Sequence, residues 1–254
     1  MCPPNDYRIR EGETLDEVFQ GRLKIIQPKK GYRFSIDAVL LTGLTQIRPQ
    51  DRVVDLGTGC GVIPLLIAFR SPADHITGIE IQESFVSMAR RNVVINNFSH
   101  LISIVQADLR NLQIGMVEGP VNLVVSNPPY GRLRSGRLNP NEERAIARHE
   151  LLASLADVVR AAAQLLPRKG RLAIIYPARR LPNLLKEISI GGFTPKDLTL
   201  IHTTLEAEAK LVHLESIKGG GEELRVRKPF AICQNDGSYT DEMKAMYANG
   251  PAAF

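Results

Sequence analysis

The stretch Val53-Val54-Asp55-Leu56-Gly57-Thr58-Gly59-Cys60-Gly61 joins a short apolar strand to a glycine-rich turn. Glycine adopts backbone conformations that other residues avoid, so such a turn allows a ligand to approach the backbone where a strand meets a helix. The dinucleotide signature Gly-x-Gly-x-x-Gly would require glycine at position 62, which is Val62. The stretch therefore predicts an α/β fold with a ligand loop that differs from the dinucleotide type.

The segments around this stretch alternate between short apolar strands and helical patterns from Asp51 to about Thr204, which predicts a mostly parallel sheet with helices on both faces. Six strands are predicted at Val53–Leu56, Ile76–Ile81, Ile102–Gln106, Leu123–Ser126, Arg171–Tyr176 and Leu198–His202. Helices are predicted near Gly61–Phe69, Ser84–Asn96, Glu143–Leu166 and Leu181–Ile190. A seventh strand, Leu211–Ile217, follows a short loop and is expected to run antiparallel, and Leu224–Cys233 is expected to form a further strand.

Residues 1–50 follow a different pattern and are expected to form an N-terminal extension. A short hairpin is predicted within Gly21–Gly31, a helix at Ile36–Leu44, and Thr14–Glu17 matches the weak capping-box pattern. The catalytic domain is expected to span 51–233. Residues 234–254 are predicted to form a tail that is only partly ordered beyond Tyr239.

Acidic side chains end three successive predicted strands. Asp55 would repel a pyrophosphate and attract a cation, so the loop with Gly57, Gly59 and Gly61 suits S-adenosylmethionine, which carries a sulfonium and an ammonium, better than NAD. Glu80, at the end of the second strand, can accept hydrogen bonds from both ribose hydroxyls. Beyond the third strand, Asp108 can accept a hydrogen bond from an adenine amino group.

The tetrapeptide Asn127-Pro128-Pro129-Tyr130 follows the apolar run 121–126. Two prolines remove two backbone donors and stiffen the chain as it leaves the sheet. The Asn127 side-chain oxygen and the Pro128 carbonyl can accept both hydrogens of an amino group, and Tyr130 offers a ring for stacking. This combination predicts chemistry on an exocyclic or amide nitrogen, with Asn127, Pro128 and Tyr130 as catalytic residues and Asn127 also next to the cofactor.

The distribution of charge indicates an anionic partner. The net charge is +5 with a pI of about 9.2, and five arginines follow the tetrapeptide without an intervening lysine: Arg132, Arg134, Arg137, Arg144 and Arg148. Guanidinium groups suit bidentate contacts to phosphate, although a solvated loop would have the same composition. Arg132, Arg134 and Arg148 are therefore candidate substrate-binding residues.

Other features of the sequence favour a cytoplasmic protein without a metal. No run approaches the ~20 apolar residues of a membrane span. The N-terminus lacks the layout of a signal peptide, and the three cysteines form neither a disulfide framework nor a C-x-x-C ligand pair. The histidines other than His149, namely His75, His100, His202 and His213, lack metal-ligand spacing.

From Asp51 to about Ile217 these motifs resemble the class I S-adenosylmethionine-dependent methyltransferases. Asn127–Tyr130 looks like the motif of enzymes that methylate amino groups, either adenine N6 or the glutamine N5 of release factors. Three segments, Lys29–Ala38, Ala147–Glu150 and Lys218–Gly221, are similar to the bacterial tRNA1(Val) adenine N6-methyltransferases, which modify the adenine just 3′ of the anticodon.

This resemblance implies a Rossmann-like, seven-stranded, mostly parallel sheet, S-adenosylmethionine as cofactor and tRNA as partner. It implies cofactor contacts for Asp55, Gly57, Gly59, Glu80 and Asp108 and target-base contacts for Asn127 and Tyr130, and Phe34 is expected to help stack the base. The roles of Arg148 and His149 and the oligomeric state stay open. A glutamine N5-methyltransferase and a non-catalytic RNA-binding module are the alternatives, and a DNA substrate is disfavoured because no target-recognition domain is evident.

Overall fold

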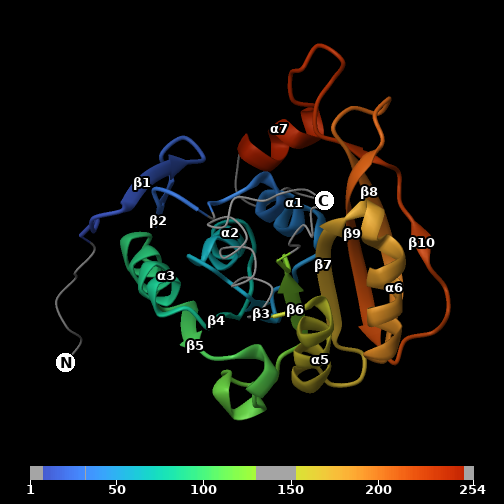
Figure 1. Ribbon diagram of the computed structural model, residues 1–254, viewed down its shortest axis with the longest axis horizontal. Coiled ribbons are helices and arrows are strands. Elements are labelled where there is room, and N and C mark those ends of the chain that lie inside the picture. Colours follow the sequence, from blue (N-terminus) through green and yellow to red (C-terminus); the bar gives the residue numbers. More distant parts are fainter. Residues whose placement is uncertain (1–7, 32, 130–152, 249–254) are drawn as a thin grey trace, which may run out of the picture.

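The structure is a computed structural model that describes residues 8–31, 33–129 and 153–248. A β-hairpin and a helix lead into one large sheet with helices on both faces (Figure 1). The strands of this sheet are β3 (Arg52–Leu56), β4 (His75–Glu80), β5 (Ile102–Gln106), β6 (Leu123–Ser126), β7 (Arg171–Pro177), β8 (Phe193–His202), β9 (Ala209–Lys218), β10 (Arg225–Val226) and β11 (Phe230–Ala231).

The strand order is β10-β8-β9-β7-β6-β3-β4-β5, and β11 also pairs with β8. Strands β3 to β7 pair in parallel, whereas β9 runs antiparallel to both β7 and β8, which confirms the predicted α/β class and the antiparallel last strand. Within the described residues the sheet has nine strands rather than seven, because Leu224–Cys233 contributes β10 and β11, which both pair with β8. Pro229 lies between these two short strands and cannot donate a backbone hydrogen bond to the ladder, so the single predicted strand is interrupted.

Two helical layers bury the two faces of the sheet. One face packs against α1 (Ile36–Leu44), α2 (Val62–Arg70) and α3 (Glu83–Ile95), and the other packs against α5 (Leu155–Leu165) and α6 (Leu181–Ile190) (Figure 1). Successive strand residues point to opposite faces, so Val53 joins the first core and Val54 the second. Burial on both faces explains why the strands are continuous apolar runs.

Short 3-10 turns complete the connections at η1 (Leu109–Asn111), η2 (Ile114–Met116) and η3 (Ala178–Arg180). The described part of the predicted helix Glu143–Leu166 begins at Leu155, later than expected. Ser154 has an extended backbone and forms a capping box with Asp157, in which each residue accepts a hydrogen bond from the other's backbone N–H. Residues before 153 in that prediction lie outside the described chain.

The N-terminal hairpin lies earlier in the chain than predicted. Strands β1 (Glu13–Val18) and β2 (Leu23–Pro28) pair antiparallel, so Thr14–Glu17 belongs to a strand and the expected capping box is wrong. The turn between them contains Phe19 and Gln20 at φ 54° and 60°. Neither residue is a glycine, asparagine or aspartate, and the turn's signal by residue type is Gly21, at φ 79°, which the sequence predicts at the start of the hairpin.

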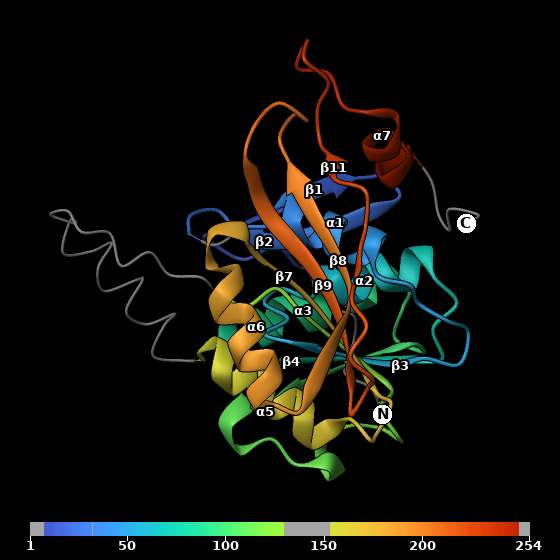
Figure 2. The same cartoon turned by 90° about the vertical axis from the view of Figure 1, so that its right-hand side faces the viewer.

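The described part of the C-terminal segment beyond Tyr239 forms a helix. This helix is α7 (Asp241–Ala248) (Figure 2). Met243 of α7 is completely buried, and the ring of Tyr247 stacks on Phe19 with centroids 5.7 Å apart. The Arg70 guanidinium donates a hydrogen bond to the carbonyl of Met246. The tail therefore packs on the hairpin and on α2, while the division into 1–50, 51–233 and 234–254 stays a prediction. Within the described residues, no helix has both the length and the apolar character of a membrane span.

Candidate active site

The glycine-rich loop connects β3 to α2 beside the end of β4. The backbone N–H groups of Gly57 and Thr58 donate to the carbonyl of Ile79, at 3.0 and 2.9 Å, so the loop is bound to the neighbouring strand. Gly57 and Gly61 have φ of 79° and 82°, in the left-handed region where a side chain is strained. A Cβ on Gly61 would also lie 3.1 Å from the Cβ of Ala89, so this glycine allows α2 to pack closely against α3.

Asp55 lies at the carboxyl end of β3, below this loop, and is fully buried. Neither of its carboxylate oxygens has a hydrogen-bond partner of standard geometry among the described residues. Burial raises the pKa of Asp55 to about 7; the Thr58 hydroxyl beside it opposes the rise, and the charge of Glu80 adds to it. A buried, unpaired carboxylate is costly, so this side chain is suited to meet a positively charged ligand group.

Glu80 ends β4 and is also buried, but its carboxylate already has partners. One oxygen accepts from the backbone N–H of Gly59 at 3.0 Å, and the other accepts from Ile81 and Gln82 at 3.0 and 2.9 Å. A carboxylate offers about four acceptor positions, so about one is left for a ribose hydroxyl. Glu80 therefore links the glycine loop to the start of α3, in addition to any contact with a ligand.

Asp108, beyond β5, is paired within its own turn. Its carboxylate accepts from the backbone N–H of Arg110 at 2.9 Å and forms an ion pair with the Arg110 guanidinium at 2.6 Å. The Arg110 hydrogen bond holds the pKa of Asp108 below its usual range, so the carboxylate stays ionised. An adenine amino group would have to share this carboxylate with Arg110.

The Asn-Pro-Pro corner begins where β6 ends. The Ser126 hydroxyl donates to the carbonyl of Leu56 at 2.8 Å and so joins the ends of β6 and β3. The side-chain oxygen of Asn127 is buried and has no hydrogen-bond partner in the described part of the chain. Pro128 is buried and Pro129 is exposed. Tyr130, Arg132, Arg134 and Arg148 lie outside the described residues.

A narrow recess of about 20 Å³ brings the corner, the glycine loop and α1 together. Its lining residues come from three separate segments: Phe34, Ser35 and Ala38 from the start of α1; Gly57, Thr58, Cys60, Val62 and Ile63 from the loop and α2; and Asn127 from the corner. The backbone N–H of Phe34 donates to the side chain of Gln27 at 2.8 Å, so the hairpin holds this wall in place. Strands β3 and β6 are the point where the sheet order reverses, and open α/β sheets bind ligands there.

Comparison with known proteins agrees with this geometry. Residues 36–188 match the family model of the methyltransferase small domain. The chain belongs to this family. A curated relative from Porphyromonas gingivalis, called tRNA1(Val) (adenine(37)-N6)-methyltransferase, is 32% identical over 75% of this chain and 76% of its own length.

Solved structures show the same fold for this methyltransferase. A predicted O-methyltransferase from Agrobacterium tumefaciens superposes with a TM-score of 0.63 at 23% identity, covering 86% of this chain and all of its own. TYW2 from M. jannaschii in complex with AdoMet gives a TM-score of 0.55 at 12% identity, covering 82% of this chain and 88% of its own. The ligand of TYW2 is the cofactor that the sequence predicts for this chain.

The residues of the methyltransferase fit this cofactor. The buried and unpaired Asp55 carboxylate can balance a cationic ligand, and the exposed Gly57 leaves backbone open in the same loop. Burial raises the pKa of the Cys60 thiol to about 12, so this residue stays a neutral wall of the recess. Across the described ranges there is no group of three or more His, Cys, Asp or Glu side chains that could hold a metal ion.

The structure brings together only part of the predicted site. Phe34, Gly57 and Asn127 line one recess, whereas Asp108 is paired with Arg110 in its own turn. Sequence reasoning missed Thr58, whose buried hydroxyl has no hydrogen-bond partner of standard geometry among the described residues. Its position between two glycines of the loop was the available signal. Ser35 also lines the recess, and no pattern in the sequence indicated it.

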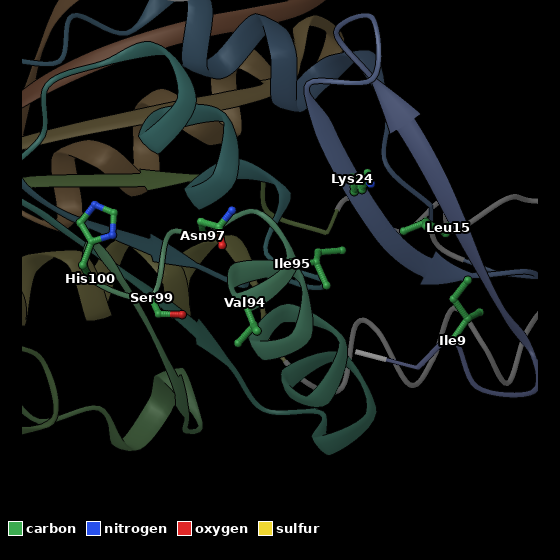
Figure 3. A pocket seen from close by; sticks show the side chains of 8 residues that line it. All are labelled: Ile9, Leu15, Lys24, Val94, Ile95, Asn97, Ser99 and His100. Carbon is green, nitrogen blue, oxygen red and sulfur yellow. The ribbon is translucent and has the colours of Figure 1, made fainter. Parts of the chain in front are cut away.

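A second, larger hollow lies elsewhere on the methyltransferase. It measures about 790 Å³ and lies between the hairpin and the end of α3, with a lining of Ile9, Leu15, Lys24, Val94, Ile95, Asn97, Ser99 and His100 (Figure 3). None of the predicted site residues belongs to it. Size alone therefore does not identify the catalytic site in this fold.

Proposed function

We propose that this methyltransferase methylates the exocyclic N6 amino group of an adenine in tRNA, next to the anticodon of tRNA1(Val). The observation that carries the proposal is the unpaired Asn127 oxygen, buried in a recess that it shares with Gly57 of the cofactor loop. The name of the Porphyromonas gingivalis relative supports the choice of adenine N6 and of tRNA.

The corner residues would act by accepting hydrogen bonds. An aromatic amine is a poor nucleophile because its lone pair is delocalised into the ring. Asn127 and the carbonyl of Pro128 would accept the two N–H hydrogens, which favours a pyramidal nitrogen and stabilises the positive charge that develops on it. The methylated nitrogen is acidic, so its proton can leave late and no strong base is required.

Alignment would supply much of the remaining acceleration. When bound, S-adenosylmethionine provides the electrophilic methyl group. Asp55 would hold the cationic end of the cofactor, and Gly57 and Gly59 would allow its close approach. Phe34, together with Tyr130 outside the described residues, would stack the splayed base beside Asn127. Alignment of reacting atoms in this way replaces a bimolecular encounter.

Nucleoside mass spectrometry tests the proposal directly. Unmodified tRNA is incubated with the enzyme and S-adenosylmethionine, digested and analysed for N6-methyladenosine, with parallel reactions on release factor and on duplex DNA. We expect N6-methyladenosine in tRNA only, at the adenine 3′ of the anticodon of tRNA1(Val). Methylation of a glutamine in release factor, with unmodified tRNA, would replace this proposal with the glutamine N5 activity.

A further inference from the structure

Exposed basic residues lie at the same sheet edge as the Asn127 corner. Strands β6 and β7 pair in parallel, with Ser126 opposite Ile174, so the segments that follow the two strands leave the sheet side by side. Arg179 lies in η3, directly after β7, and is exposed. Leu211 of β9 pairs with Pro177, which places the exposed Lys210 at the same edge.

A second pair of basic residues lies on the other side of the recess. Lys29 and Lys30 are exposed in the loop between β2 and α1, a few residues before the recess wall at Phe34. The neighbouring Arg33 is different, because it forms an ion pair with Asp16 at 2.5 Å and so belongs to the hairpin. In Figure 2, the loop that enters α1 and the start of α6, which follows η3, lie on the same side of the molecule.

The four side chains carry positive charge that the surrounding residues offset only in part. No ion pair or side-chain hydrogen bond joins Arg179, Lys210, Lys29 or Lys30 to another residue of the described chain. Two carboxylates lie in the loop before Lys210, and one of them, Glu206, accepts a hydrogen bond from Asn235. Glu11 lies beside Lys29, whose backbone N–H donates to Gly12.

We propose that these four residues form a two-sided basic rim that docks the phosphates on either side of the target adenine. The inference rests on the proposed function. The recess lies beside Asn127, so a base held at Asn127 leaves its adjoining nucleotides across the segments that flank the recess. The exposed side chains of Arg179 and Lys210 on one side, and of Lys29 and Lys30 on the other, suit the phosphates of a single-stranded RNA loop that curves past the site.

Charge reversal at the rim tests the inference. The variants are Arg179→Glu with Lys210→Glu, and separately Lys29→Glu with Lys30→Glu. The control is Lys169→Glu, because Lys169 is exposed and lies just before β7, at the opposite end of the strand that Arg179 follows. Steady-state methylation of tRNA is measured across a range of salt concentrations, together with S-adenosylmethionine affinity by calorimetry and Tm.

Each rim variant should raise KM for tRNA about tenfold or more, with kcat at saturating tRNA and cofactor affinity close to wild type. The dependence of log(kcat/KM) on log salt should become shallower by about 0.7 for each phosphate that the variant no longer binds. Lys169→Glu should match the wild type. The inference is overturned if the rim variants have the KM and salt dependence of Lys169→Glu.

A stability control and two outcomes distinguish failure of the rim inference from failure of the proposed function. If a glutamate pair lowers Tm, the corresponding alanine pair carries the same test, with the same change in salt dependence for each phosphate contact that is lost. If the wild type does not methylate tRNA, the proposed function fails and the rim inference fails with it. If the wild type methylates tRNA and no rim variant differs from the control, only the rim is wrong.

Discussion

The aspartates near the two ends of β3 differ in how their buried carboxylates are satisfied. At the amino edge, Asp51 pairs with the Arg171 guanidinium and accepts from the Arg48 backbone N–H at 2.7 Å. At the carboxyl edge, Asp55 and Asn127 have buried oxygens without hydrogen-bond partners in the described residues. The two edges are one strand length apart, so the difference arises from which side chains end each strand.

Buried polar groups with a partner are expected to stabilise the fold, whereas those without a partner are candidates to bind a ligand. A satisfied buried group stabilises the protein, and its removal leaves the partner uncompensated. An unsatisfied group costs stability and is retained for another reason. Matched substitutions at the two ends of one strand should therefore have opposite consequences for activity and stability.

The largest effect is expected from the two asparagines that flank β6. Asn127→Ala should lower kcat by about 100- to 1,000-fold with little change in cofactor affinity, because it removes an acceptor that acts on the developing charge. Asn122 accepts from the Arg52 backbone N–H at 2.9 Å and donates to the carbonyl of Gln50 at 3.2 Å. Asn122→Ala should cost about 1–2 kcal/mol of unfolding free energy and leave kcat unchanged. Methylation assays, calorimetry and urea unfolding measure these quantities; a normal kcat for Asn127→Ala would contradict the assigned role.

The next effect concerns the aspartates at the two ends of β3. Asp55→Asn should weaken S-adenosylmethionine binding about 10- to 100-fold without loss of stability, since a buried and unpaired charge is removed. Asp51→Asn should lower the unfolding free energy by about 3–5 kcal/mol, because Arg171 is left buried without its partner, and should not change cofactor affinity in the folded protein. Equal cofactor affinities for the two variants would contradict the assignment of Asp55 to the cofactor site and of Asp51 to the fold.

A smaller effect is expected in the dependence of stability on pH. The folded-state pKa of Asp55 is raised from 3.8 to about 7, so the folded protein binds the extra proton and stability from this group is lost as pH rises from about 4 to 7. Asp55→Asn should remove that loss. Burial lowers the pKa of His213 to about 4, so stability from this histidine rises with pH over much of the same range. The effect of Asp55 is therefore measured as the difference in unfolding free energy between variant and wild type at each pH. Parallel pH profiles of unfolding free energy would show that Asp55 does not titrate in this way.

The smallest effect should separate two buried threonines. Thr45 donates to the carbonyl of Leu41 at 2.7 Å and bonds the His213 ring at 2.9 Å, whereas the Thr58 hydroxyl has no partner of standard geometry among the described residues. Thr45→Val should cost about 1–2 kcal/mol of unfolding free energy, and Thr58→Val less than about 0.5 kcal/mol. Thr58→Val should instead reduce cofactor affinity severalfold. A larger stability loss for Thr58→Val would place this hydroxyl in the fold rather than in the site.

Local patterns in the sequence predicted most of the elements but not all of their connections. Strand β6 and helix α6 lie within the predicted ranges because apolar runs and the Gly191-Gly192 stop depend on neighbouring residues only. The hairpin turn at Phe19 and Gln20 was missed, since neither residue is a usual turn residue and Phe19 packs against α2 and α7.

Sequence alone determined the chemistry of the site: a glycine loop after a strand, acids at strand ends and a stiff Asn-Pro-Pro corner. These features are local, so spacing and residue type were enough to identify them. Tertiary structure decided which of them meet. Pairing of β3 with β6 brings Asn127 beside Gly57, and the hairpin holds Phe34 against both. Such contacts join residues far apart in the chain, and only the packed sheet determines which oxygens stay without a partner.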